Sequence, residues 1–202
     1  MHRALFFCVA AAIPLIASSA DLAAQSNSCQ VPTQCVRPDW NWPHSSRYLS
    51  ATYFDRSYPR DPKAAPPRQH LGVDLGAPAD TRIESPVAGT IVRVRANSNA
   101  AEAYMIIRET STGYEHVLGH VTTTYREGRR VARGEYVARV MRWSGNSHVH
   151  WGVNNAGVER ATGTSSRRGW GSGNWGWGRA PVSATRSEAS ERGWVDPERF
   201  AR

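Results

Sequence analysis

The sequence predicts an all-β fold of short antiparallel strands that form a groove, with an irregular N-terminal extension. Two observations lead to this fold class. Apolar and β-branched residues occur in short runs, and the 17 glycines and 12 prolines of this 202-residue chain help to separate those runs. In addition, no segment carries the sustained 3.6-residue apolar period of a long helix. With 40% hydrophobic and 21% charged residues, the composition is sufficient for a packed core.

The predicted strands begin soon after residue 70, and Gly, Pro or polar residues separate them. Residues 111–113, Ser-Thr-Gly, are typical of a hairpin turn between two of these strands. In chain order, the expected strands lie at or around Val73–Leu75, Ile83, Thr90–Val94, Tyr104–Arg108, Tyr114–Val121, Val131, Tyr136–Val140, Val149–Val153 and Trp194.

Residues 1–20 have the three parts of a secretory signal peptide. His2 and Arg3 form a basic head, the apolar run Leu5–Ile16 follows, and small residues at 18–20 offer a cleavage site. The apolar run is shorter than the ~20 residues that a membrane-spanning helix needs. We therefore expect export to the periplasm or the extracellular space, with no transmembrane anchor after cleavage.

Residues 21–67 are expected to form the N-terminal extension, which ends in a Pro-rich linker at 61–67. Cys29 and Cys35 lie in this extension and remain after the signal peptide is removed. Because exported chains meet an oxidising environment, this pair predicts one small disulfide loop. The domain that carries the function is expected to span residues 68–202.

Residues 161–193 depart from the strand pattern and are rich in Gly, Ser, Arg and Trp. Gly and Ser are compatible with a flexible linker, but Trp170, Trp175 and Trp177 favour an ordered insertion because exposed indole rings are costly. The insertion leaves soon after a strand with two histidines, so we expect it to form a rim of the groove where these tryptophans contact substrate. Packing of the tryptophans against their own domain is the alternative.

The chain is basic, with 25 Lys and Arg against 17 Asp and Glu, a formal net charge of +8 and a pI near 10.0. Such a balance is typical of nucleic-acid-binding proteins, but the signal peptide and the lack of a nucleic-acid motif argue against that partner. An anionic polymer of the cell envelope fits an exported basic protein better. A basic surface without a dedicated partner is the alternative.

Three motifs carry residues with the chemistry of a catalytic zinc site. His70 and Asp74 are four residues apart in Q-H-L-G-V-D, His120 ends G-Y-E-H-V-L-G-H, and His148 and His150 form an H-x-H pair. Residues i and i+2 of a strand share a face, so the H-x-H side chains should point together. Zinc prefers imidazole nitrogen and carboxylate oxygen in a tetrahedral shell. Each motif is weak alone, since two surface histidines on a strand are common, but together they indicate a metal site.

The same motifs resemble those of the lysostaphin/LytM-type zinc endopeptidases, which cleave peptide bonds in bacterial peptidoglycan. The segments that carry the resemblance are H-L-G-V-D-L-G-A-P, S-P-V-A-G-T-I-V-R-V, R-E-G-R-R-V-A-R-G-E and the closing W-V-D-P-E-R-F. The resemblance implies that His70, Asp74 and His150 bind one Zn²⁺ ion per chain. It also implies that His148 is a catalytic histidine that does not bind the metal.

A second catalytic histidine has two candidates, His116 and His120, which alternation along one strand places on the same face. In the resembling family this histidine lies eight or nine residues before a glycine hairpin. His120 is eight residues before Gly128, whereas His116 is twelve before it, so the resemblance favours His120. His116 is then expected on the same face but farther from the metal, either near the substrate or buried on the groove floor.

The resemblance implies an exported zinc metalloendopeptidase that acts on peptide stems or cross-bridges of peptidoglycan, with a monomer favoured and no nucleic-acid partner. The sequence lacks the Glu base of an H-E-x-x-H motif. Proton transfer would therefore fall to His120 and His148, whose division of roles stays open. The alternative is a non-catalytic domain of the same type that binds the wall and activates other hydrolases. Such a domain would typically lack zinc ligands, which this chain retains.

Overall fold

The computed structural model describes residues 35–36, 53–54, 56–57, 68–143, 147–162 and 175–200. The expected signal peptide, Cys29 and Trp170 lie outside these residues. The strands are β1 (Cys35–Val36), β2 (Arg56–Ser57), β3 (Arg68–His70), β4 (Val73–Gly76), β5 (Arg82–Glu84), β6 (Gly89–Arg95), β7 (Tyr104–Glu109), β8 (Glu115–Gly119), β9 (Val121–Thr122), β10 (Arg130–Val131), β11 (Tyr136–Val140), β12 (His148–Asn154), β13 (Arg179–Pro181) and β14 (Trp194–Val195). The helical elements are η1 (Ala100–Glu102), α2 (Val158–Thr162), α3 (Arg186–Glu191) and η2 (Pro197–Phe200).

Strands dominate the described chain, and the predicted all-β fold class is confirmed. The longest of the described helices, α3, has 6 residues. None of these helices has the length and apolar character needed to cross a membrane. The strands expected from the apolar runs are all present, whereas β1, β2, β3 and β13 were not among the predicted strands.

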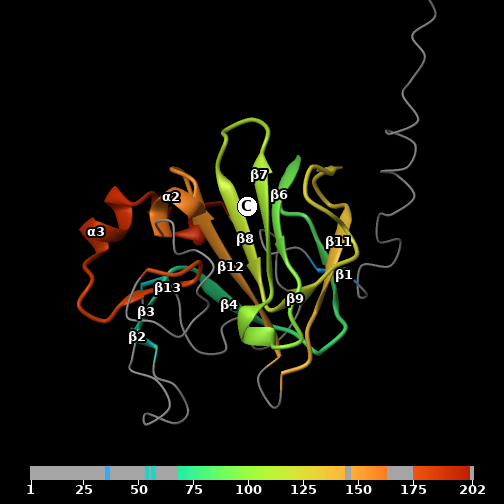
Figure 1. Ribbon diagram of the computed structural model, residues 1–202, viewed down its shortest axis with the longest axis horizontal. Coiled ribbons are helices and arrows are strands. Elements are labelled where there is room, and N and C mark those ends of the chain that lie inside the picture. Colours follow the sequence, from blue (N-terminus) through green and yellow to red (C-terminus); the bar gives the residue numbers. More distant parts are fainter. Residues whose placement is uncertain are drawn as a thin grey trace, which may run out of the picture.

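The described strands form three sheets (Figure 1). The largest has the order β10-β6-β7-β8-β12-β14, and β4 also pairs with β12. A second sheet has the order β1-β5-β11-β9, and a third the order β13-β3-β2. Neighbouring strands run antiparallel except for β1 and β5, which are parallel.

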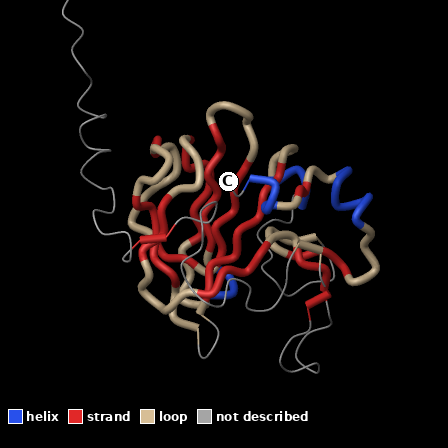
Figure 2. The backbone as a smooth tube through the Cα atoms, turned by 180° about the vertical axis from the view of Figure 1, so that it is seen from behind, coloured by secondary structure: helices blue, strands red, loops and turns tan. Residues whose placement is uncertain are grey.

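The largest sheet buries side chains on both of its faces. On one face, Trp151 and its neighbours pack with Ile83 and other residues of the second sheet. On the opposite face, Trp177 and Trp194 belong to a second cluster that includes residues of α2 and α3. Figures 1 and 2 show these two helices at the end of the molecule away from β1 and β11. Because successive strand residues point to opposite faces, His150 and Trp151 belong to different layers.

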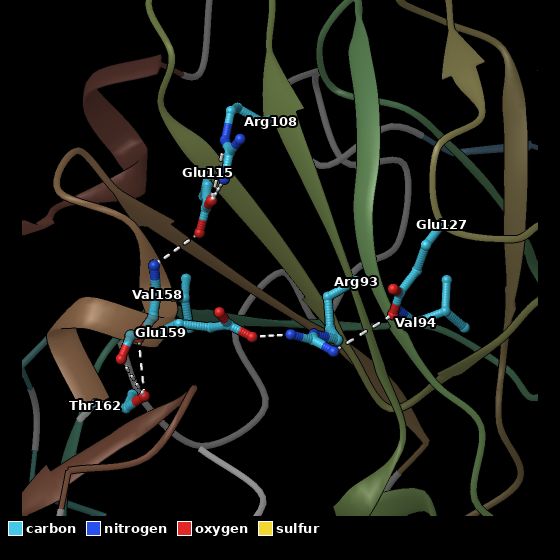
Figure 3. A network of polar contacts seen from close by, with 8 residues as sticks. All are labelled: Arg93, Val94, Arg108, Glu115, Glu127, Val158, Glu159 and Thr162. Carbon is cyan, nitrogen blue, oxygen red and sulfur yellow. Dashed lines mark hydrogen bonds and ion pairs between the residues drawn. The ribbon is translucent and has the colours of Figure 1, made fainter. Parts of the chain in front are cut away.

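A network of charged residues fastens α2 to the large sheet (Figure 3). The carboxylate of Glu115 in β8 accepts hydrogen bonds from the guanidinium of Arg108 (2.7 Å) and from the backbone N–H of Val158 (2.7 Å). Arg93 of β6 forms an ion pair with Glu159 in the first turn of α2. The side chain of Glu115 is only 5% exposed, and a buried carboxylate needs such partners. These contacts therefore hold α2 in a fixed position against the sheet.

Two residues of the N-terminal extension are packed on the domain. Tyr53 is 8% exposed, and its hydroxyl donates to the carbonyl of Trp194 (3.0 Å). The N–H of Phe54 donates to the carbonyl of His70 (2.7 Å). The guanidinium of Arg186 in α3 lies over both aromatic rings, at 5.6 and 5.4 Å from their centroids. This part of the extension thus borders strand β3, which begins the predicted metal site.

Candidate metal centre

Three buried side chains from three strands converge on one point. His70 is the last residue of β3, Asp74 follows in β4 after a bend, and His150 of β12 lies directly opposite Asp74. Nε2 of His70 is 3.0 Å from Oδ1 of Asp74 and 2.9 Å from Nδ1 of His150, which is 3.1 Å from the same Oδ1. The three side chains are at most 3% exposed. The structure thus brings the three predicted ligands together in one triangle of donor atoms.

Protons alone cannot satisfy all three contacts of this triangle. The Asp74 carboxylate only accepts, and if both imidazoles donate to it, the contact between His70 and His150 joins two N–H groups. A cation that receives one lone pair from each corner satisfies all three contacts. In a tetrahedral zinc shell with bonds of about 2.0–2.1 Å, ligand atoms lie about 3.3 Å apart, close to the spacing here. Two imidazole nitrogens and one carboxylate oxygen are also donors that zinc prefers, so these residues fit a zinc ion.

Burial and neighbouring charge keep two corners of the triangle, Asp74 and His150, in the protonation state that binds a metal. Burial by itself raises the pKa of Asp74, but the charges of His70 and His148 and the hydrogen bonds from His150 and His70 hold this pKa well below its usual value. Burial lowers the pKa of His150 to about 4. At neutral pH the carboxyl group is therefore ionised and the His150 imidazole is neutral, as metal ligation requires.

Two further buried histidines flank the triangle. Nε2 of His148 is 3.6 Å from Oδ2 of Asp74, so the H-x-H side chains share a face as predicted. The ring centroid of His120 is 4.5 Å from that of His148 and 6.3 Å from that of His150. Nδ1 of His120 is 2.8 Å from the carbonyl oxygen of Ala100, which can only accept, so Nδ1 carries the proton. Because burial holds the pKa of His120 well below its usual value, the ring is neutral and Nε2 keeps a lone pair.

Residues 68–162 contain this triangle and both flanking histidines, and they match the family model of peptidase family M23. This region belongs to peptidase family M23. The family resemblance read from the sequence motifs is thereby confirmed.

Several solved structures are similar to this chain at low sequence identity. A mutant catalytic domain of the prophage-encoded M23 protein EnpA from Enterococcus faecalis is 22% identical, with a TM-score of 0.43 over 56% of this chain and 85% of that one. The lysostaphin catalytic domain from Staphylococcus simulans is 18% identical, with a TM-score of 0.39 over 44% and 70% of the two chains. A zinc containing peptidase from Vibrio cholerae is 23% identical, with a TM-score of 0.42 over 55% and 34%. The comparison with curated proteins gave no match.

Residues 68–162 are called the M23 domain below, and the face of its large sheet that carries the triangle is called the metal face. His120 reaches this metal face through a left-handed backbone conformation. Strand β8 ends at Gly119, which lies opposite His150 in the sheet. Strict alternation would turn the next side chain to the other face. His120 has a φ of 61°, however, and its ring lies beside those of His148 and His150. The expectation that His116 and His120 share a strand face is therefore wrong.

His116 lies on the other face of the sheet, in the core of the M23 domain. Its ring stacks on Trp151 at a centroid distance of 6.2 Å and an interplanar angle of 19°, and the indole Nε1 of Trp151 donates to Nδ1 of His116 (3.3 Å). Phe200 meets the ring edge-on at 6.1 Å, and Nε2 is 3.8 Å from Glu109. His116 is therefore a core residue. The expectation that it lies on the groove face, either near the substrate or on the groove floor, is wrong.

Two tryptophans enclose His120. The ring of Trp143 stacks on His148 (5.5 Å, 20°) and tilts against His120 (4.8 Å). Trp177 meets the rings of His120 and His150 edge-on at 5.5 and 5.4 Å. Trp177 is 3% exposed, so it packs against its own domain. The expectation that Trp177 contacts substrate is wrong. Trp143 was not singled out from the sequence, where its position five residues before His148 is the available signal.

Proposed function

We propose that this chain is an exported zinc endopeptidase that hydrolyses peptide bonds in bacterial peptidoglycan. The observation that carries the proposal is the buried triangle of His70, Asp74 and His150 with two more buried histidines beside it. Membership of the M23 domain in a peptidase family supports the reaction class. The signal peptide expected in residues 1–20 supports export.

Zinc bound by the triangle would lower the pKa of a coordinated water and polarise the scissile carbonyl group. The protein then has to remove a proton from the attacking water and stabilise the negative charge that forms on the carbonyl oxygen. We assign proton removal to Nε2 of His120, because its Nδ1 is already engaged with the carbonyl of Ala100. We assign charge stabilisation to His148, because its ring lies beside the triangle, with Nε2 3.6 Å from Oδ2 of Asp74.

Peptidoglycan suits the charge of this chain. The formal net charge of +8 would attract an anionic wall polymer over long range and raise the rate of encounter. Peptide stems and cross-bridges supply the peptide bonds. A non-catalytic role as a wall-binding activator is less well supported, because that role requires neither three metal ligands nor two buried histidines at the same point.

The proposal is tested with purified protein by measuring its zinc content and the new amino groups released from isolated peptidoglycan. Wild type should contain one zinc ion per chain and release amino groups. Asp74→Asn should lose both zinc and activity, because it removes the anionic ligand. His120→Ala and His148→Ala should keep zinc and lose activity, since these residues are assigned to proton transfer and charge stabilisation.

His116→Gln is the matched control, since it replaces a buried histidine of the same sheet on the opposite face. It should keep both zinc and turnover. Zinc-loaded wild type that releases no amino groups from peptidoglycan would overturn the proposed function. Full turnover by His120→Ala would overturn the assignment of the base.

A further inference from the structure

The C-terminal part of the chain closes over the metal centre. After α2, the chain returns as residues 175–181, and β13 pairs with β3 so that Arg179 lies opposite His70. The carbonyl of Gly178 accepts a hydrogen bond from the N–H of Leu71 (2.9 Å). The strand that carries the first metal ligand is thus held by a segment that lies outside the region matched to the peptidase family.

Trp177 fills a gap that Gly119 leaves in the metal face. Asp74, His150, Gly119 and Tyr104 lie directly opposite one another in four adjacent strands and form one row across the sheet. Gly119 contributes no side chain to this row. A Cβ atom at Gly119 would lie 2.2 Å from Cζ3 of Trp177, so the indole occupies the space above this glycine. Its ring also lies 5.2 Å from that of Tyr104.

Residues 175–181 leave little room around the rings of His150 and His120. A Cβ atom at Gly178 would lie 3.1 Å from Nε2 and 3.2 Å from Cε1 of His150, so the backbone runs along the face of this ring. His150 is therefore packed against both Trp177 and the Gly178 backbone. His120 lies between Trp177 and Trp143. Trp177 itself is fixed, since it belongs to the second hydrophobic cluster and is 3% exposed.

We propose that Trp177 is a positioning residue that fixes the ring orientations of His150 and His120. The inference rests on the proposed zinc peptidase function. A metal–imidazole bond and proton transfer at a ring nitrogen both depend on ring orientation, and groups packed around such rings set it. A metal centre with full affinity and turnover therefore requires the C-terminal segment in addition to the family region.

The first test compares Trp177→Ala with Trp175→Ala in the full-length chain. Trp175 is the matched control, because it comes from the same segment but packs under the guanidinium of Arg192 (4.7 Å). Co²⁺ replaces zinc, since its visible absorption spectrum reports ligand geometry. Trp177→Ala should change this spectrum and release the metal to a chelator about tenfold faster. It should also lower kcat more than it changes KM, whereas Trp175→Ala should leave the spectrum and the rate of metal release at wild-type values.

The second test uses the fit between Gly119 and Trp177. Gly119→Ala should reproduce the spectral change, because the added methyl group forces the indole out of its place. In the Trp177→Ala background, the same Gly119→Ala change should add little, since the space is then empty. Trp177→Phe retains an aromatic ring and should restore most of the wild-type spectrum.

A wild-type Co²⁺ spectrum and release rate in Trp177→Ala would overturn the proposal, as would fully additive effects of the Gly119 and Trp177 changes. If Trp177→Ala does not fold, Gly178→Ala against Gly176→Ala provides the comparison. A Cβ at Gly176 would have its nearest neighbour at an ordinary 3.7 Å. Only Gly178→Ala should alter the spectrum. The spectra report positioning even if wild type fails to hydrolyse peptidoglycan, so the two proposals fail separately.

Discussion

The buried His116 is expected to make folding stability depend on pH within a defined window. Its side chain is 1% exposed, and burial lowers its pKa from 6.5 to about 4, against the opposing effect of Glu109. Between these two values the unfolded chain binds a proton that the folded state does not bind. Stability from this group is therefore complete above pH 6.5 and is lost as the pH falls towards 4. At about 1.4 kcal/mol per pH unit, the loss amounts to about 3 kcal/mol.

This prediction is checked by urea denaturation of wild type and His116→Gln between pH 7 and pH 4 at equal zinc concentration. The other histidines occur in both proteins, so their contributions cancel in the difference. Glutamine keeps an acceptor for the indole N–H of Trp151, which limits the pH-independent cost of the change. The free energy of unfolding of wild type should fall by about 3 kcal/mol more than that of the variant across this range. An equal fall in both proteins would show that His116 is not held neutral by its burial.

Other contacts lead to separate expectations. Glu115→Ala should lower the free energy of unfolding by about 2–3 kcal/mol, because the buried N–H of Val158 and the guanidinium of Arg108 lose their acceptor. A change below about 0.5 kcal/mol, which is the scatter of surface substitutions, would contradict this. Tyr53→Ala should lower the free energy of unfolding by about 3 kcal/mol and Tyr53→Phe by only about 1 kcal/mol, since the second change removes one hydrogen bond and no ring. Equal melting temperatures for the two variants would refute this ranking. Trp143→Ala should lower kcat on peptidoglycan about tenfold with zinc content unchanged, because the proposed catalytic histidines, His120 and His148, lose a packed neighbour. Loss of zinc instead would contradict the place assigned to Trp143.

Local alternation along a strand was enough to predict part of the site. His148 and His150 share a face because their backbone is regular, and that regularity follows from the sequence. The same rule failed for His120, whose left-handed φ of 61° interrupts the alternation at the end of β8. Histidine adopts a left-handed backbone conformation more readily than most residues, but the presence of a histidine does not require that conformation. The placement of His116 in the opposite layer could not be predicted for the same reason.

The contact between Trp177 and Gly119 could not be predicted from the sequence, for a different reason. Indole rings require burial, and Trp177 is buried as this requirement predicts. The requirement does not say which surface covers the ring. That choice depends on the pairing of β13 with β3, and neither strand has an apolar pattern of its own.

The pairing of β13 with β3 also sets the order in which the molecule can be assembled. Arg179 lies opposite His70 although 109 residues separate them along the chain. Closing so long a loop is entropically costly, whereas β6, β7 and β8 are consecutive strands joined by short connections. During synthesis, β6, β7 and β8 can therefore pair well before residue 181 has left the ribosome. A nascent chain can thus hold these paired strands while the candidate metal centre still lacks the segment that covers it.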